Sequence, residues 1–269
     1  MTKKRVAMPD YTLLDHPLLL SFIFYPRKEV TPCPANGFDL MVPVGPSVSV
    51  ACRFYLGRPE WPSILFFHGN GEVASDYDGT AFFYHQKGTN LIVADYRGYG
   101  ASTGTPTLTD LVSDAPKILE AVREELRKRN AHPGLYVMGR SLGSISAIEL
   151  AYRHQDSFRG MLIESGFTSV VRIIRHLGIP APLSPLEEID RACVGMIEQI
   201  RLPTLILHGQ NDTLVPFEEA EDLYRHLGSE KKELLMIPGA THNDILIVGL
   251  KRYFDAIGRF VKESSALSP

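Results

Sequence analysis

Two kinds of hydrophobic segment alternate along the chain. Residues 38–44 and 48–56 are rich in strand-forming residues and flank a turn signal, Gly45-Pro46-Ser47, so they predict an antiparallel hairpin. Six later segments are short and uniformly apolar, at residues 64–67, 91–94, 135–138, 160–163, 205–207 and 234–237. Strands that are apolar at every position are buried on both faces, which is typical of a parallel sheet.

Helical patterns lie between these segments. Residues 108–129 carry apolar side chains at helical spacing, with an expected kink at Pro116. Residues 217–227 follow Pro216, which suits the first turn of a helix. Residues 245–261 place their apolar side chains on roughly one stripe. Strands that alternate with helices predict a doubly wound α/β domain.

Two regions depart from this alternation. Residues 1–37 are rich in proline, and only 18–25 form an apolar segment, which predicts a short helix or strand at the domain edge. The interval 167–202 is too long for a simple crossover and contains three prolines. We expect it to form a small helical cap over the carboxyl edge of the sheet, the alternative being an ordinary crossover helix and a loop. The chain, 1–269, is then a single domain with this insertion.

The composition is that of an ordinary soluble globular chain. Of 269 residues, 44% are hydrophobic and 22% are charged, and the formal net charge is -3. The longest basic run is Arg127-Lys128-Arg129, so we expect no nucleic acid and no anionic membrane as partner. The three cysteines are widely separated and odd in number, which predicts free thiols in a reducing compartment.

The N-terminal residues do not form the pattern of a signal peptide. Lys3-Lys4-Arg5 precede apolar residues, but prolines and acidic residues interrupt the apolar region. No stretch approaches the roughly 18 apolar residues of a membrane span. We therefore expect no integral membrane segment and a cytoplasmic location.

Chemically reactive side chains follow several of the predicted strands. In an open α/β sheet, functional groups gather just beyond the carboxyl ends of the strands. Ser141 follows one apolar run within a G-R-S-L-G motif at 139–143, and Asp212 and His242 follow the last two runs. A G-x-S-x-G motif between a strand and a helix predicts a tight turn that exposes the serine hydroxyl. These three residues are therefore candidates for one shared site.

Five motifs in this order resemble those of the α/β-hydrolases, from the hairpin to the last helix. They are H-G-N-G at 68–71, D-Y-R-G-Y-G at 95–100, G-R-S-L-G at 139–143, the run 202–216, and G-A-T-H at 239–242. The chain is most similar to small serine hydrolases that include bacterial cytosolic esterases and eukaryotic depalmitoylating abhydrolases. The resemblance implies the α/β-hydrolase fold: a mostly parallel sheet of the eight-stranded type, with helices on both faces. The membrane-anchoring segments of the eukaryotic relatives have no counterpart here, which argues against a membrane-bound lipidated protein as substrate.

The order Ser, Asp, His is the one that this fold uses. A serine hydroxyl needs a base, so Ser141 is the expected nucleophile and His242 the base that activates it. Asp212 is expected to orient the imidazole and to stabilise its charged form. The backbone N–H groups of Leu142 and Asn70 are the expected oxyanion hole, with Gly71 allowing the loop to turn inward.

Other titratable residues near these motifs have alternative interpretations. Glu164 follows a strand after which some family members place the triad acid, but we favour Asp212. Asp95 follows the wrong strand, and we expect it to hold the following turn through Arg97. Three further residues are expected to support loops or a helix start rather than catalysis: His68, His208 and Asp244.

Two questions stay open at this point. Arg140, beside the nucleophile, is either oriented by packing or a surface ion pair or able to reach a substrate carboxylate. The apolar residues of the predicted cap either line an acyl pocket or form their own small core: Ile173, Ile174, Leu177 and Ile179.

These residues predict a serine hydrolase that cleaves a small-molecule carboxylic ester or thioester through an acyl-serine intermediate. No cofactor and no metal is expected, because the chain has no H-E-x-x-H, no cysteine pair and no P-loop. Dehalogenase and epoxide-hydrolase chemistry is disfavoured, because those relatives carry Asp where this chain has Ser141. The alternatives are a small-amide or peptide hydrolase with the same triad, and a non-catalytic binding module on the same fold.

Overall fold

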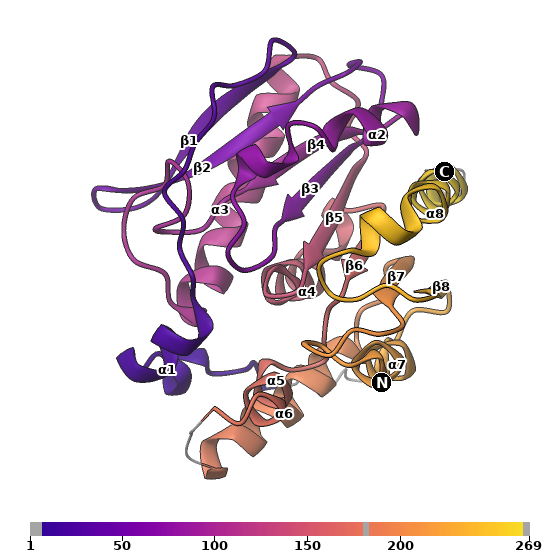
Figure 1. The fold of residues 1–269 in the computed structure, drawn as a ribbon. Helices are drawn as coiled ribbons and strands as arrows, with labels where there is room; N and C mark the ends of the chain where they lie inside the picture. Colours follow the sequence, from indigo (N-terminus) through magenta and orange to yellow (C-terminus); the bar gives the residue numbers. More distant parts are fainter. Residues whose placement is uncertain (1–6, 180–182, 266–269) are drawn as a thin grey trace.

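An eight-stranded sheet runs through the centre of the molecule, with strand order β1-β2-β4-β3-β5-β6-β7-β8 (Figure 1). The structure is a computed structural model that describes residues 7–179 and 183–265. The strands are β1 (Gly37–Gly45), β2 (Val48–Tyr55), β3 (Ser63–Phe67), β4 (Asn90–Ala94), β5 (Leu135–Arg140), β6 (Gly160–Glu164), β7 (Thr204–Gly209) and β8 (Lys232–Ile237).

Strands β1 and β2 form the predicted antiparallel hairpin, and β2 joins the sheet antiparallel to β4. All other neighbouring strands are parallel. The six uniformly apolar segments are all strands, so the predicted, mostly parallel sheet is confirmed. Strands β3 to β7 are buried at every position, whereas the edge strand β8 is mostly half-buried because it has a neighbour on one side only.

Helices cover both faces of this sheet, as predicted. They are α1 (Pro17–Ile23), α2 (Ala81–Gln86), α3 (Leu108–Lys128), α4 (Gly143–Arg153), α5 (Val170–His176), α6 (Leu183–Ile197), α7 (Phe217–His226) and α8 (Ile245–Ser265). Alternate side chains of β3 enter different cores: Leu65 and Phe67 pack with residues of α3 and α4, and Ile64 and Phe66 pack with residues of α2 and α8. This alternation explains why each central strand is apolar at every position.

The helix boundaries follow the sequence signals closely. Helix α7 begins directly after Pro216, and α3 continues through Pro116 as one element. Helix α8 begins at the predicted residue, and Gly249 inside it has non-helical angles, φ -120° and ψ 16°. The apolar segment 18–25 is mostly helix α1, which settles the choice between helix and strand.

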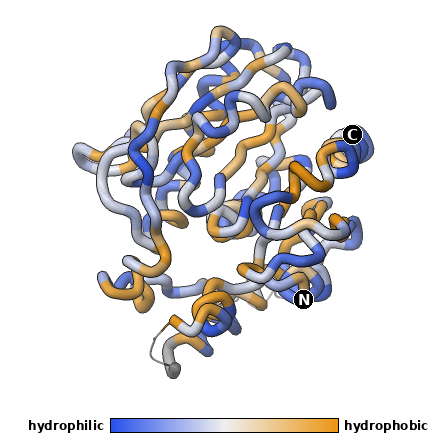
Figure 2. Tube along the Cα trace, viewed as in Figure 1, coloured by the Kyte–Doolittle hydropathy of each residue, from blue (hydrophilic) through white to orange (hydrophobic). Residues whose placement is uncertain are grey.

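Two helices, α5 and α6, occupy the interval 167–202, and α1 lies at the same end of the molecule (Figure 1). Residues 180–182, which include two prolines of the predicted cap, lie outside the described residues. Figure 2 shows that much of α1 is hydrophobic, although it lies at the periphery of the fold. Whether the interval 167–202 acts as a cap stays a prediction at this point.

The three cysteines are free, with Cys52 and Cys193 buried and Cys33 half-buried. In the described parts of the chain, no helix combines the length and the apolar character needed to cross a bilayer.

Candidate active site

Ser141 occupies the predicted tight turn between β5 and α4. Its φ is +49°, in the left-handed region that residues other than glycine rarely adopt. The turn packs closely against its surroundings, because a Cβ added at Gly143 would lie 2.1 Å from the Phe67 carbonyl oxygen and one at Gly139 would lie 2.5 Å from the Gly143 oxygen. Both flanking glycines are therefore required for the close approach of strand and helix.

The structure brings Ser141, His242 and Asp212 together. The His242 Nε2 atom lies 3.0 Å from the Ser141 Oγ atom, and the Nδ1 atom lies 2.7 Å from Asp212 Oδ2. The other Asp212 oxygen, Oδ1, accepts hydrogen bonds from the N–H groups of Leu214 and Val215, at 3.0 and 2.8 Å. Each of these three residues comes from a different strand end, after β5, β7 and β8, as the sequence predicted.

The surroundings of Asp212 favour its charged form. Burial alone would raise the pKa of the Asp212 carboxyl, but the hydrogen bond and the charge of His242, together with the Val215 N–H, lower it below the ordinary value. His208 lies nearby, with Nε2 3.4 Å from Asp212 Oδ2 and 2.8 Å from the Val215 carbonyl oxygen. Burial lowers the pKa of His208, so this imidazole is neutral and donates to the loop.

The alternative acid, Glu164, forms its hydrogen bonds with residues other than His242. Its carboxylate accepts hydrogen bonds from Arg140 Nε at 3.0 Å and from the Tyr253 hydroxyl at 2.6 Å. The acid that faces the His242 Nδ1 atom is Asp212.

One sequence prediction about the loop after β4 is wrong. Asp95 does not pair with Arg97; its Oδ1 atom lies 3.1 Å from His68 Nε2 and accepts the Ala74 N–H at 2.7 Å. Arg97 instead extends to α3, where it contacts Asp114 at 2.7 Å and Asp110 at 2.8 Å. Both acids lie on one face of that helix, and sequence spacing could not reveal that this face borders the loop.

The backbone N–H groups of Asn70 and Leu142 are available for an oxyanion. Both residues line the cavity at Ser141, and neither N–H donates to a carbonyl within the described part of the chain. The turn after Asn70 is made by Gly71, whose φ is +75°.

The side chain of Asn70 has a role that the sequence did not suggest. Its Oδ1 atom accepts the N–H of Tyr25 at 3.0 Å and the hydroxyl of Tyr99 at 2.7 Å, and its Nδ2 group donates to the Ile23 carbonyl oxygen. These bonds tie the end of α1 to the H-G-N-G loop, over 45 to 47 residues of sequence. No local pattern could have signalled such a contact.

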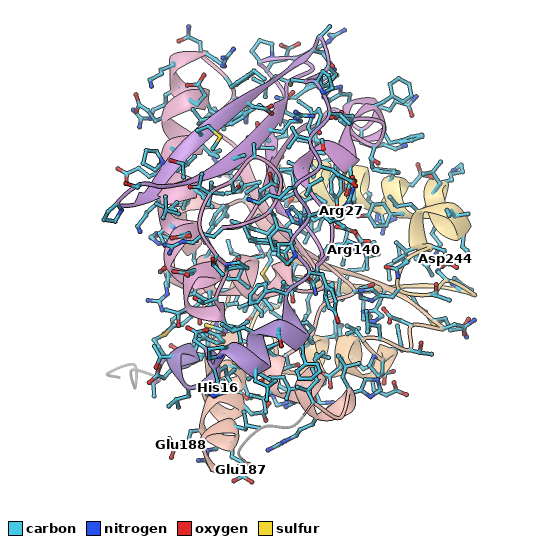
Figure 3. All side chains as sticks on the ribbon, turned by 60° about the vertical axis from the view of Figure 1, so that its left-hand side comes forward. His16, Arg27, Arg140, Glu187, Glu188 and Asp244 are labelled. Atoms are coloured by element: carbon cyan, nitrogen blue, oxygen red, sulfur yellow. The ribbon has the colours of Figure 1, made fainter. Side chains whose placement is uncertain are left out.

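Arg140 is 8% exposed, and its guanidinium lies in a buried ion-pair network rather than in a surface pair. It contacts Glu72, Glu164, Asn243 and the backbone oxygen of His242. Figure 3 shows Arg140 within the body of the molecule and Asp244 at its edge. Asp244 accepts the N–H of Thr241 at 2.6 Å and so closes the turn that carries His242.

A cavity of about 440 Å³ opens at Ser141. One side consists of apolar residues from α1, α5 and the short segments that follow these helices, which we call the helical wall: Phe22, Ile23, Tyr25, Val170, Ile173, Ile174, Leu177 and Ile179. The four residues left open by the sequence therefore line the cavity, and Ile174 also belongs to the main core. None of the described lining residues is an Asp or a Glu.

Within residues 7–179 and 183–265, no group of three or more His, Cys, Asp or Glu side chains is arranged to hold a metal ion.

His68 contacts the backbone oxygen of Gly69 at 2.8 Å as well as Asp95, and so supports its own loop as expected.

Comparisons with known proteins agree with this fold. Protein bem46 of Schizosaccharomyces pombe is 31% identical over 218 residues, which cover 77% of this chain and 70% of that protein. Human alpha/beta hydrolase domain-containing protein 17B is 29% identical over 220 residues, covering 80% of this chain and 71% of the relative. The solved structure of the Pyrococcus furiosus esterase Pf2001 superposes with a TM-score of 0.70 at 18% identity, over 88% of this chain and 98% of the esterase chain.

The model of the family described as "Serine aminopeptidase, S33" matches residues 60–184 and 186–246. These segments contain the serine turn, both of its partners and the H-G-N-G loop. The chain therefore belongs to this serine aminopeptidase S33 family, within the α/β-hydrolase superfamily.

Proposed function

We propose that this α/β-hydrolase cleaves a carboxylic ester or thioester through an acyl-Ser141 intermediate. The observation that carries the proposal is the continuous chain of contacts from the Ser141 hydroxyl through the His242 imidazole to the Asp212 carboxylate, at 3.0 and 2.7 Å. Both distances are within hydrogen-bond range, which is the geometry that a general base needs.

The reaction then has two halves. The Ser141 Oγ atom attacks the carbonyl carbon while its proton passes to His242 Nε2, and His242 returns this proton to the alcohol or thiol when the ester bond breaks. In the second half, His242 takes a proton from water, which attacks the acyl carbon. The acid leaves, and Ser141 regains its proton. Asp212 keeps Nδ1 protonated and stabilises the imidazolium in both halves.

The negative oxygen of each tetrahedral intermediate is stabilised by the N–H groups of Asn70 and Leu142. Preorganised donors of this kind are worth about 2.7–4 kcal/mol each in transition-state stabilisation. The helix α4 begins directly after Leu142, so the positive end of its dipole adds to this effect.

The cavity suits an uncharged acyl group. Its helical wall offers apolar contact, and a volume of about 440 Å³ is within the usual range for a small-molecule site. Within the predicted cap at 167–202, α5 and the residues 177–179 cover this cavity together with α1, because α5 supplies Val170, Ile173 and Ile174. A small acyl ester or thioester is therefore the substrate that fits. The location that we propose for the enzyme is the cytoplasm, a reducing compartment that suits its free cysteines.

The family description raises a second candidate, the release of an amino-terminal residue from a peptide. A free amino terminus is best bound by a carboxylate, and the described residues lining the cavity include none. Ester chemistry is therefore favoured over aminopeptidase chemistry.

Hydrolysis of p-nitrophenyl esters, the matching thioesters and p-nitroanilides of equal acyl length tests this choice. We expect turnover of the esters or thioesters, at least 100-fold slower turnover of the anilides, and loss of both in Ser141→Ala. Faster cleavage of the anilides would favour the amide alternative. A folded protein that cleaves none of them would favour a binding module.

A further inference from the structure

We infer that Arg140 is a positioning residue, which aligns the turn carrying His242 and the loop carrying Asn70 with the nucleophile on its own strand. This inference rests on the proposed function. Arg140 borders the cavity at Ser141, but among the described residues its guanidinium donates to carboxylate, amide and backbone oxygens around the site rather than to Ser141 or the His242 ring.

The guanidinium contacts three separate segments. Its Nε atom donates to Glu164 on β6 at 3.0 Å, and its Nη1 atom donates to Glu72 in the H-G-N-G loop region. Its Nη2 atom donates to the backbone oxygen of His242 at 2.8 Å and to Asn243 Oδ1 at 3.3 Å. One side chain, next to Ser141 in sequence, is thereby bonded to the peptide unit of the catalytic base.

The two carboxylates that pair with Arg140 also bond to other parts of the molecule. Glu72 Oε2 accepts the N–H of Gly69 at 2.7 Å and the hydroxyl of Tyr77 at 2.7 Å. Gly69 directly precedes Asn70, so the Arg140–Glu72 pair fixes the loop that presents one oxyanion donor. Glu164 is held in turn by the hydroxyl of Tyr253 on α8.

Two of the three charged groups of this network, Arg140 and Glu72, are favoured in the charged form, whereas burial raises the pKa of the Glu164 carboxyl above its ordinary value. Burial would lower the pKa of the Arg140 guanidinium, but Glu72 and Glu164 raise it above its ordinary value. Burial would likewise raise the pKa of Glu72, and the charge of Arg140 holds it below its ordinary value. Four hydrogen bonds occupy most of the five N–H donors of Arg140, so the alternative role of binding a substrate carboxylate is disfavoured.

A buried ion network is weak evidence for stability alone, since apolar replacements of such groups are often as stable. Its geometry matters more here. A misplacement of about 1 Å in a catalytic group can cost about 100-fold in rate, and Arg140 is bonded to the backbone of His242 itself.

The chain offers a matched control. Arg53 on β2 is 2% exposed and also bridges two carboxylates, Asp39 at 2.7 Å and Asp78 at 3.1 Å. It does not line the cavity. Arg53→Met removes a comparable buried ion network without touching the candidate site.

The test compares Arg140→Met, Arg140→Lys and Arg53→Met in ester hydrolysis and thermal unfolding. We expect Arg140→Met to lower kcat by about 100-fold with KM changed less than threefold, and Arg140→Lys to recover part of kcat. Arg53→Met should lower the melting temperature and leave kcat within threefold. A kcat of Arg140→Met within threefold of wild type, or a rise in KM alone, would overturn the inference. If Arg140→Met does not fold, Glu72→Gln replaces it, with an expected kcat loss of about tenfold; unchanged kcat there overturns the inference.

A second readout does not depend on turnover. The proton between His242 Nδ1 and Asp212 should give a far-downfield ¹H NMR signal, assigned by its loss in His242→Ala. We expect this signal to shift or broaden in Arg140→Met, or in Glu72→Gln, and to persist in Arg53→Met. If it changes as expected although the wild type cleaves no ester or thioester, the positioning role stands and the proposed reaction falls. An unchanged signal overturns the positioning role whatever the ester assay gives.

Discussion

The two sides of the cavity are built in different ways. On one side, Ser141, Asp212, His242 and the Asn70 loop stand at strand ends, where the register of a buried sheet fixes their backbones. On the other side, the helical wall consists of α1 and α5, which are short helices of seven residues each at the periphery of the sheet. Hydrogen bonds and ion pairs hold the side chains of the first side, whereas the second side presents mainly apolar side chains to the cavity.

This difference separates reaction from selectivity. The strength of a hydrogen bond changes when its distance changes by a few tenths of an ångström, so changes on the strand-end side should alter the rate for every substrate. Apolar contacts are additive and non-directional, so changes in the helical wall should alter the preference among acyl chains. The two sides also differ in exposure to solvent: Phe22 of the helical wall lines the cavity and is 46% exposed, whereas Ser141 is 8% exposed.

The largest effect is expected on the strand-end side. His242→Ala removes the only group in hydrogen-bond contact with the Ser141 hydroxyl among the described side chains, and should lower kcat by about 10⁶ for all acyl lengths. Steady-state kinetics with a short and a long ester measure this. A loss confined to one chain length would contradict the separation of the two sides.

Asp212→Asn should lower kcat by about 10⁴, because the amide no longer fixes the imidazole tautomer. Asp244→Asn is the matched control, since it removes a carboxylate two residues from His242 but keeps an Oδ1 atom that can accept the Thr241 N–H, the one side-chain hydrogen bond of Asp244 among the described residues. That variant should stay within threefold of wild type. Equal losses in the two variants would remove the role assigned to Asp212.

A change in the helical wall should act on selectivity instead. Ile173→Trp fills part of the cavity and should displace about two methylenes of a long acyl chain. At about 0.8 kcal/mol per methylene, kcat/KM for an octanoate ester should fall by roughly 15-fold. The kcat/KM for the corresponding acetate ester should change less than threefold. Ile247→Trp, at a position that is 84% exposed and outside the cavity, is the control and should alter neither.

The smallest effect is a pH dependence of stability. The pKa of Asp212 is lowered in the folded state: burial opposes this, and its hydrogen bond with His242 outweighs burial. A lowered folded pKa stabilises the fold above the unfolded value of about 3.9, and this contribution is lost as pH falls through the folded pKa. The free energy of unfolding, measured in urea, should therefore differ less between wild type and Asp212→Asn at pH 3 than at pH 5. A difference that is constant over this range would contradict the assigned environment.

The strand-end side could largely be predicted from the sequence, and the helical wall only in part. The candidates Ile173, Ile174, Leu177 and Ile179 line the cavity, but the contribution of α1 was not predicted. Uniformly apolar runs identify buried strands, and residues after those runs must meet at one edge because the strands are parallel. Ser141, Asp212 and His242 follow such runs and lie together in the structure, and their catalytic roles belong to the proposed function. The hydrogen bonds of Asn70 to the end of α1 join residues at least 45 positions apart, and nothing in either segment encodes the partner.

The partners of charged side chains do not follow from the sequence. The motif at 95–100 predicts a pair between Arg97 and Asp95, yet Arg97 reaches Asp114 on α3. Arg140 lies within the best-defined motif of the chain, yet its partners come from β6 and from two loops. Long side chains reach across elements, so their partners depend on the tertiary arrangement rather than on spacing.

Covalent labelling by a fluorophosphonate probe tests the central claim most directly. The probe reacts with a serine that a neighbouring base has activated, whatever the natural acyl group is. We predict one equivalent of label in the wild type, mapped by peptide mass spectrometry to Ser141, and none in Ser141→Ala. An equal mass increase in Ser141→Ala, or no labelling of the folded wild type, would contradict it.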